Sequence, residues 1–317
     1  MATPNTLEKA IWLKLMGLGI IPGAGLGNVF YVDGVNGNDA WDGLTPNTPF
    51  ATITHALTQC VADNDDYIIV LDHWQEVVAI NVTRVHIIGI PANPNHSFVQ
   101  MNAAADTAIF TVTALSNNCE IAGFSFGGGA THAAIENVAG TPMGLYIHHC
   151  QFGHAFAGNT PQDGIRISVN ATNIRVEHCK FLGPDSPEGT ITRDGIHWVS
   201  GGDPMGGAFH KNVFHGLSGG IGINLAAVAA LTGGFIIDEN LFYVAIADAM
   251  AAGWAITLAG PGNVAHCLIS GNYASQTGDN TGTNPFRDLS TGVLATCLNG
   301  WVGNYVGQLI SAGPAVV

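Results

Sequence analysis

Short apolar segments, each followed by a polar residue and then an aromatic one, recur along the chain. Clear copies occupy residues 147–152, 176–181, 209–214 and 237–242, weaker copies begin at 269 and 302, and earlier segments at 86–89 and 121–126 look similar. The central position of each later copy is Cys or Asn, and successive ones are 29, 33, 28, 32 and 32 residues apart: Cys150, Cys179, Asn212, Asn240, Asn272 and Asn304. Spacing of this size indicates a repeat protein.

A second pattern runs in phase with the first. Short segments with alternating apolar residues precede the copies, at residues 134–137, 164–167, 195–198 and 220–223, and less regularly at 254–256 and 293–295. Alternation over a few positions indicates a strand, and the Gly, Asn, Asp and Pro residues between the segments indicate turns. Each repeat is therefore predicted to contain at least two short strands.

Stacked strands are the arrangement that such repeats can stabilise. A strand of three or four residues cannot bury its own apolar side, but equivalent strands stacked ~4.8 Å apart pair their backbones and align like side chains inside. Asn suits the recurring turn because it tolerates left-handed backbone angles and can hydrogen-bond to its neighbours in the stack. Helical periodicity is absent after Cys60, and a propeller fits the spacing worse. The sequence predicts an all-β fold, a right-handed parallel β-helix (solenoid), over residues 28–317.

The start of the predicted solenoid has the most specific local pattern. It combines Phe-Tyr-Val-Asp, Gly-Asn-Asp, Asp-Gly, Pro-Phe-Ala-Thr-Ile and Ala-Leu, at residues 30–33, 37–39, 42–43, 49–53 and 56–57. This block resembles the N-terminal block of pectate-lyase-like (pectin lyase-like) β-helix proteins. The resemblance extends over residues 28–317 and implies the fold. It leaves the activity open, because this superfamily includes lyases, hydrolases, phage tailspikes and non-catalytic surface proteins.

Two helices are predicted near the N-terminus. The resemblance implies a short capping helix that plugs the open end of the solenoid, and residues 52–62 have the helical spacing for it. Residues 1–27 are predicted to form a separate apolar arm, helical from Glu8 and ended by Pro22 and a Gly-rich link. The arm either packs on the solenoid or contacts a partner, and the partner is favoured. Candidate interface residues lie in the arm and in two later apolar stretches: Trp12, Leu15, Met16, Leu225, Val228, Leu231 and Met250.

Composition argues against several classes of partner. Only 10% of the 317 residues are charged, against about 25% in an average soluble domain; this fits either self-association or a neutral solenoid surface. The net charge of −14 rests on nine basic residues, too few for the Lys and Arg clusters that bind nucleic acid or anionic lipid. No stretch has the roughly 18 apolar residues of a membrane span, and the N-terminus reads poorly as a signal peptide for general secretion.

Metal, cofactor and disulfide sites are not predicted. The six cysteines are too few and too scattered for a disulfide scaffold, and none forms a Cys-x-x-Cys pair. Residues 33–39 are similar to a calcium loop, but Leu44 occupies the position of its bidentate Glu, which favours an ordinary turn. His149 and His178 align one repeat apart, and an exposed stacked pair is favoured over a metal site.

Alignment of the repeats brings candidate catalytic residues together. It stacks inward and outward neighbours in four successive coils: Ile135 with Glu136, Ile165 with Arg166, Ile196 with His197, and Ile221 with Gly222. By the same alignment Asp163 and Asp194 lie one coil apart, near Arg193. Two carboxylates ~5 Å apart can have split pKa values and suit a retaining glycosidase. Asp-Gly before a strand is also common turn chemistry, so these three residues are candidates and no catalytic residue is assigned.

These features together favour a non-catalytic structural protein of a phage-like particle. The lack of an export signal, the apolar arm on a Gly-rich link and the uncharged, Ala-rich solenoid fit a homotrimer on the virion. It would be a head decoration or a tail spike or fibre component, joined to other particle proteins through its arm. The alternative is a polysaccharide lyase or glycoside hydrolase acting in the solenoid groove, and a third interpretation is a glycan-binding adhesin.

Overall fold

The structure is a computed structural model of the chain. It describes residues 27–72, 75–92, 96–103, 105–137, 139–154, 161–168, 170–184, 189–199, 204–217, 220–225, 233–243, 255–258, 267–275, 286–288, 299–306 and 309–311. The predicted arm, apart from Gly27, lies outside the described residues. Its helix and the domain boundary after residue 27 therefore stay predictions.

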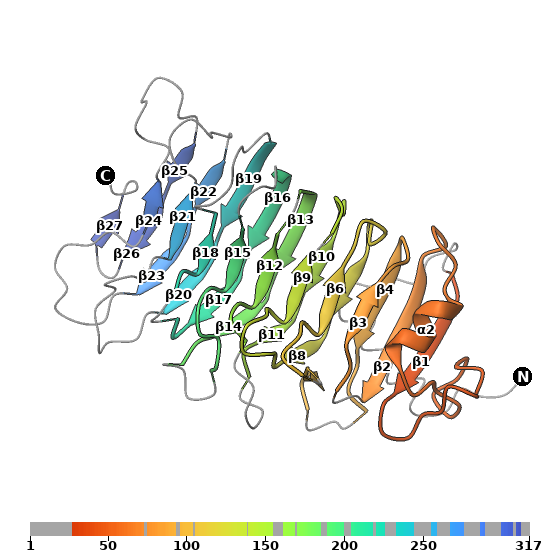
Figure 1. Cartoon of the computed structure of the whole chain (residues 1–317). Coiled ribbons are helices and arrows are strands. Elements are labelled where there is room, and N and C mark those ends of the chain that lie inside the picture. The colour runs from red at the N-terminus through yellow and green to blue at the C-terminus, as the bar shows by residue number, and fades with distance from the viewer. Residues whose placement is uncertain are drawn as a thin grey trace, which may run out of the picture.

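Three sheets wind into a solenoid in the described residues (Figure 1). Sheet 1 contains β1 (Val29–Asp33), β2 (Asp66–Asp72), β4 (Val85–Gly89), β7 (Glu120–Ala122), β10 (Tyr146–His148), β13 (Ala171–Glu177), β16 (Pro204–His210), β19 (Gly233–Asp238), β22 (Leu268–Ser270) and β25 (Gly300–Val302). Sheet 2 contains β5 (Val99–Met101), β8 (Phe124–Phe126), β11 (Gln151–Phe152), β14 (Lys180–Leu182), β17 (Val213–His215), β20 (Leu241–Tyr243), β23 (Tyr273–Ser275), β26 (Asn304–Val306) and β27 (Leu309–Ser311). Sheet 3 contains β3 (Val78–Ile80), β6 (Phe110–Val112), β9 (Ile135–Asn137), β12 (Ile165–Ile167), β15 (Ile196–Trp198), β18 (Ile223–Asn224), β21 (Ile256–Leu258) and β24 (Phe286–Asp288).

Parallel pairing between successive coils confirms the predicted parallel β-solenoid. For example, β10 pairs with β7 on one side and with β13 on the other, both in parallel. The exception among the named strands is β27, which folds back antiparallel on β26. A full coil holds three strands, because the first sequence pattern spans a turn: its apolar part lies in sheet 1 and its aromatic residue in sheet 2. The right-handed sense stays a prediction.

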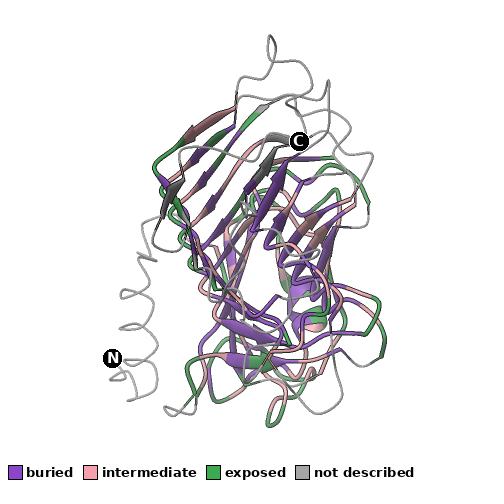
Figure 2. Ribbon diagram, turned by 90° about the vertical axis from the view of Figure 1, so that its left-hand side faces the viewer, coloured by how far each residue is buried: buried purple, intermediate pink, exposed green. Residues whose placement is uncertain are grey.

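Columns of identical or similar side chains fill the interior. The strongest is a stack of phenylalanine rings on sheet 2, with successive centroid distances of 5.2, 4.8, 4.7 and 4.7 Å: Phe126, Phe152, Phe181, Phe214 and Phe242. Each of these rings is buried, and the purple, buried segments lie along the strands in Figure 2. Burial of whole apolar side chains is the main driving force for the stack.

The sharp turn from sheet 1 to sheet 2 places one residue per coil in the left-handed region. The φ angles of these residues lie between 49° and 79°: Gly123, His149, His178, Lys211, Glu239, Gly271 and Gly303. The prediction that Asn occupies the left-handed position is therefore wrong, since each Asn follows that residue. The Asn side chain instead points into the core, where it hydrogen-bonds to the neighbouring asparagines and to a strand carbonyl.

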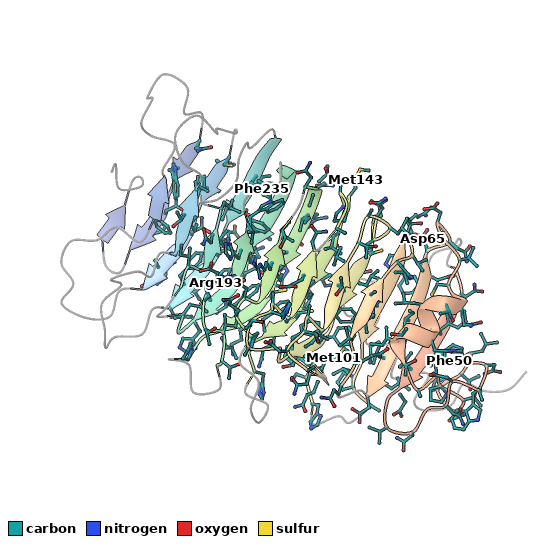
Figure 3. All side chains as sticks on the ribbon, in the orientation of Figure 1. Phe50, Asp65, Met101, Met143, Arg193 and Phe235 are labelled. Atoms are coloured by element: carbon teal, nitrogen blue, oxygen red, sulfur yellow. The ribbon has the colours of Figure 1, made fainter. Side chains whose placement is uncertain are left out.

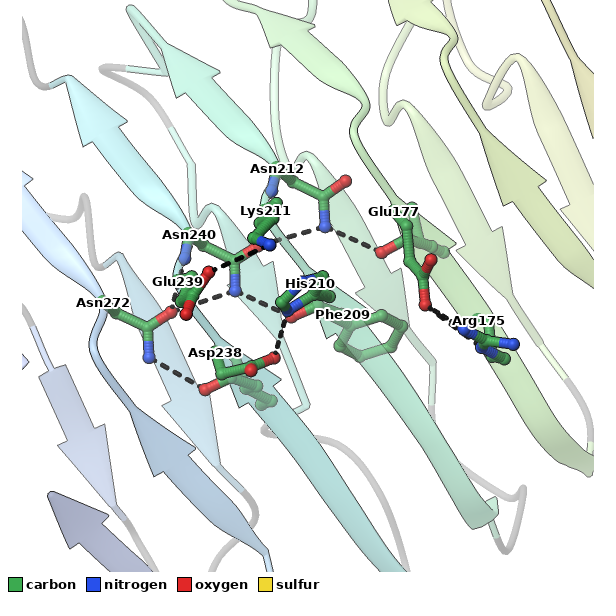
Figure 4. Close-up of polar contacts among 12 residues, drawn as sticks. Arg175, Glu177, Phe209, His210, Lys211, Asn212, Asp238, Glu239, Asn240 and Asn272 are labelled. Atoms are coloured by element: carbon green, nitrogen blue, oxygen red, sulfur yellow. Dashed lines mark hydrogen bonds and ion pairs between the residues drawn. The ribbon is translucent and has the colours of Figure 1, made fainter. Parts of the chain in front are cut away.

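Asparagine side chains form a buried ladder at this turn (Figure 4). The Asn240 Oδ1 accepts from the backbone N–H of Asn212 at 2.9 Å and from its Nδ2 at 3.0 Å. The Asn240 Nδ2 donates to Oδ1 of Asn272 at 2.9 Å and to the carbonyl of Phe209 at 2.8 Å. The same bonds recur from Asn272 to Asn304. The predicted hydrogen bonding between stacked asparagines is confirmed.

Helix α2 (Ile53–Gln59) lies inside the range predicted to be helical. It begins after Thr52, whose hydroxyl accepts from the His55 N–H, and the Glu76 carboxylate accepts from two further N–H groups of its first turn. Its buried residues join the solenoid core, and it lies beside β1 and β2 in Figure 1. Its role as a cap stays a prediction. Among the described residues, no helix has the length and apolar character to cross a membrane.

We expect Asn240→Ala to destabilise the solenoid. The substitution leaves the Asn212 N–H without its partner in the core and removes a hydrogen bond from the Phe209 carbonyl, and an unsatisfied buried group costs about 1–3 kcal/mol. Thermal unfolding followed by circular dichroism should show a clear drop in midpoint. Asn47→Ala, at an exposed position, is the control and should leave the midpoint unchanged. Equal midpoints for the two variants would contradict the role of the ladder.

Candidate functional site

The outer face of sheet 3 presents a polar column in the middle coils. The register pairs Glu136 with Arg166 and Arg166 with His197, as predicted. In the next coil, however, His197 pairs with Asn224 and Ile196 with Ile223. The predicted assignment of Ile221 and Gly222 to these columns is therefore wrong by two residues. The Ile221 N–H instead donates to the Asp194 carboxylate at 2.7 Å.

The three predicted catalytic candidates lie together beside this column. Asp163 and Asp194 each stand two residues before a strand of sheet 3, and the Gly164 N–H donates to the Asp194 carbonyl at 3.0 Å. The Arg193 guanidinium, labelled in Figure 3, bonds both carboxylate oxygens of Asp163, with Nε to Oδ1 at 2.8 Å. The Asp194 N–H also donates to that carboxylate, at 3.2 Å.

Asp194 has its own set of partners. Besides the Ile221 N–H, the Asn224 Nδ2 donates to its Oδ2 at 2.9 Å. His197 lies between the two carboxylates, with Nδ1 at 3.3 Å from Asp194 Oδ2 and 3.5 Å from Asp163 Oδ2. Neither contact of Nδ1 is aligned as a hydrogen bond. The imidazole is therefore held close to both acids without bonding strongly to either.

The two carboxyl groups have pKa values shifted in opposite directions. Burial acts to raise the pKa of Asp163, but the contacts of His197 and Arg193 outweigh burial and lower it. Burial also raises the pKa of Asp194, and its hydrogen bonds with Asn224 and Ile221 only partly offset this effect. The negative charge of Asp163 adds to the increase. The pair is thus split in the way that two neighbouring carboxylates often are.

Burial limits what these acids can do. Asp163 is 0% exposed and Asp194 2% exposed, whereas the Arg193 side chain is 32% exposed. A general acid or nucleophile must touch the bond that it cleaves, and neither carboxylate reaches the surface. In this conformation a ligand meets the guanidinium of Arg193 and the edge of His197. The acids position these two side chains.

A cation would find three ligand atoms here. One atom each from Asp163, Asp194 and His197 lie within 4.8 Å of one another, the single such group found in the described part of the chain. Calcium takes six to eight oxygen ligands and a catalytic zinc at least three protein ligands. Arg193 already neutralises Asp163, so a metal ion would have to displace a bound guanidinium. The expected absence of a metal stays a prediction.

A second polar network, missed by the sequence interpretation, lies on the outer face of sheet 1. The Glu120 carboxylate lies between His86, whose Nδ1 is 2.5 Å away, and His148, whose Nε2 is 2.6 Å away. Burial acts to raise the pKa of Glu120, but these two contacts outweigh it and lower it to about 2. The sequence contained a signal for this network. A polar residue directly precedes each of three inward isoleucines of sheet 1, and these polar residues share one register column: His86, Glu120 and Tyr146.

The network continues along sheet 1 through paired side chains. The Tyr146 hydroxyl donates to Glu177 at 3.0 Å, and the Arg175 guanidinium bonds the same carboxylate. Further along, His210 contacts Asp238 at 2.8 Å (Figure 4). Burial, followed by the charge of Glu177, raises the pKa of Tyr146 to about 12. This hydroxyl therefore keeps its proton near neutral pH.

Two other predicted groups can be placed. His149 and His178 stack with centroids 5.1 Å apart and an interplanar angle of 11°, as expected for a stacked pair. Leu225 is 0% exposed and belongs to the solenoid core, so its proposed role in a subunit contact is corrected: the side chain is already buried within its own chain. The remaining interface candidates lie outside the described residues: Trp12, Leu15, Met16, Val228, Leu231 and Met250.

Comparisons with known proteins give no family for the chain. No protein-family model matches it, and no curated protein does. Among solved structures it is similar to a rhamnogalacturonan lyase, with 14% identity and a TM-score of 0.35 over 83% of this chain and 80% of that one. It is also similar to a GH136 lacto-N-biosidase from Eubacterium ramulus, with 10% identity and a TM-score of 0.21 over 96% and 70% of the two chains. Neither likeness is close enough to inform function.

We expect Asp163→Ala and Asp194→Asn to affect stability differently. Removal of the Asp163 carboxylate leaves the Arg193 guanidinium without its hydrogen-bonded acid, which should cost about 1–3 kcal/mol of stability.

Asp194→Asn removes a carboxylate whose charged form is disfavoured in the fold, as its raised pKa shows. Wild type should therefore lose stability relative to Asp194→Asn as the pH rises through that pKa. Thermal midpoints from pH 3 to pH 8 test both points, and a variant advantage that shrinks with rising pH would contradict the second.

We expect Glu120→Gln to be most damaging near neutral pH. The folded pKa of about 2 lies below the ordinary 4.5, so the ionised group stabilises the fold above pH 4.5, and this contribution is lost as the pH falls from there through about 2. The midpoint difference between wild type and variant should thus narrow over that window. Glu239→Gln, at a carboxylate whose side chain is 55% exposed, is the control and should show little difference at either pH.

Proposed function

We propose that this protein is a non-catalytic structural component of a phage-like particle, a head decoration or a tail spike or fibre subunit that assembles as a homo-oligomer. The observation that carries the proposal is the burial of both candidate catalytic carboxylates. Asp163 is 0% exposed and is neutralised by Arg193, and Asp194 is 2% exposed with both oxygens bonded. An enzyme acting on a polysaccharide needs these groups at its surface.

The pairing of the other outward charges supports the same function. Glu120 is bonded by two histidines, Glu177 by Arg175, and Glu239 by Lys211 at 3.3 Å. Charges paired within the chain stiffen a surface and leave few groups to bind a substrate. A solenoid with backbone bonds above and below each coil also resists unfolding and proteolysis, as an exposed particle surface requires.

The sequence supports the proposed homotrimer and the proposed attachment to the particle. The low charge content favours contacts with other copies, for which a homotrimer is proposed, and the apolar arm at residues 1–27 is proposed to join the protein to other particle proteins. Location in the virion is proposed on the same two features.

The native mass of the full chain tests the assembly. Light scattering after size exclusion should give three times the chain mass of 32.9 kDa. A protein that stays at 32.9 kDa at micromolar concentration would contradict the homo-oligomer. Mass spectrometry of particles purified from the source tests the location, where capsid or tail proteins should co-purify with it.

Cleavage of a polysaccharide is the second candidate, because Asp163 and Asp194 lie close together with oppositely shifted pKa values. It would require Arg193 to move and expose the acids. New reducing ends or unsaturated uronates, released from a panel of neutral and acidic glycans by wild type and lost in Asp194→Asn, would favour it over the structural role. Binding without cleavage, unchanged in that variant, would indicate an adhesin.

A further inference from the structure

An exposed apolar ridge runs along the last coils of the solenoid. It follows the corner between sheets 1 and 2 and consists of five side chains that are 36–60% exposed: Ile236, Leu268, Tyr273, Val302 and Tyr305. Tyr273 and Tyr305 are register partners on β23 and β26, and Ile236 and Leu268 are partners on β19 and β22. These two pairs therefore form two columns along the solenoid axis, one on each sheet, and Val302 lies two residues after Gly300, the register partner of Leu268.

In the column that contains Val302, the outward position carries charge in earlier coils, whereas the Tyr273 column already holds Leu241 in the coil before. On sheet 1 the register passes from Glu177 through His210 and Asp238 to Ser270 and Val302. At the corner, the left-handed position changes from Lys211 and Glu239 to two glycines. Residues 267–275 and 299–306 contain no Asp, Glu, Lys, Arg or His. The change from paired charges to apolar groups is confined to the outward positions.

The opposite end of sheet 1 shows how apolar outward residues are treated elsewhere in this fold. Ile69, Ile88 and Ala122 occupy one outward column and are 0% exposed. They form a second apolar cluster, separate from the main core. On the strands of sheet 1, outward apolar side chains are thus covered at Ile69, Ile88 and Ala122 and exposed at Ile236, Leu268 and Val302. A bare apolar strip of this kind on a water-soluble surface is typical of a protein contact.

We infer that the ridge is the contact through which copies of this chain associate, and this inference rests on the homo-oligomer proposed above. Charge favours this part of the surface for the contact. Each copy carries a net charge of −14, so two copies repel wherever acidic surfaces meet. The uncharged ridge lets like-charged copies approach and bury apolar area, whereas a basic partner would be drawn to the acidic surface instead. Copies aligned in parallel about a common axis bring their ridges together coil by coil.

Two substitutions in the ridge test the contact. In the full chain, Leu268→Glu with Tyr305→Glu should raise the dissociation constant of the oligomer by at least ~30-fold, because each buried charge opposes association. The matched control is Val35→Glu with Leu115→Glu, at residues 62% and 56% exposed outside the ridge; it should keep the native mass of wild type. Thermal unfolding verifies that both double variants are folded.

A cross-link gives a measurement that does not depend on weakening the fold. Tyr273→Cys, treated with a short bismaleimide, should give covalent multimers on a denaturing gel. Wild type is the baseline, because its described cysteines are buried or half-buried and Cys297 lies outside the described residues; the variant should give multimers beyond those of wild type.

The outcomes separate the two proposals. A monomeric wild type overturns the homo-oligomer and the ridge contact together. An oligomeric wild type that keeps its mass in the ridge variant and does not cross-link through Tyr273→Cys overturns the ridge contact alone. Loss of binding to a glycan panel in the ridge variant, with the oligomer intact, also overturns it and indicates a sugar-binding strip. Dissociation of the ridge variant, with the control intact and cross-linked multimers present, supports the contact.

Discussion

The buried asparagine ladder is the interaction on which the later coils depend. Each carboxamide accepts from the amide groups of the preceding coil and donates to the next asparagine and to a strand carbonyl. Because both ends of the side chain are used, a coil cannot shift along its neighbour without leaving polar groups unsatisfied in the core. The ladder therefore fixes the register, and the register decides which outward side chains meet. The His210–Asp238 and Lys211–Glu239 contacts join coils that the ladder links, whereas the Asp163–Arg193 cluster lies in earlier coils, where the pairing of β12 with β15 sets the register.

The sequence predicted the solenoid because its inward positions repeat. Spacing of the Cys and Asn residues and of the isoleucines was enough to place most strands in register. The failure at Ile221 has a physical cause: in a strand of period two, a shift by two residues keeps the same face inward. Ile221 and Ile223 therefore looked equally suitable. Only the hydrogen bond from the Ile221 N–H to Asp194 distinguishes them. The left-handed position gave no signal either, because its residue varies from His to Lys, Glu and Gly.

The sequence predicted where the candidate site lies but not how deeply its two carboxylates are buried. Alignment alone brought Asp163, Asp194 and Arg193 together, since all three stand just before strands of sheet 3. Alignment says nothing of how deeply a side chain lies, because depth depends on the length and direction of neighbouring side chains. Arg193 lies across Asp163, and Asn224 reaches back to Asp194. The Glu120 network was missed because its side chains occupy outward positions of sheet 1, whereas the alignment was followed outward only on sheet 3.

In this fold, the outward-facing side chains determine what the protein can bind or catalyse. The interior columns remain largely apolar from coil to coil, while the outer face of sheet 1 passes from covered apolar residues, through paired charges, to exposed apolar residues. Such variation costs the core nothing, because alternate residues point away from it. Similar coils can therefore support unrelated functions. In the described residues several outward charges bond to one another, and five large apolar side chains lie exposed near the corner between sheets 1 and 2. These exposed apolar side chains are the groups on which the proposed association depends.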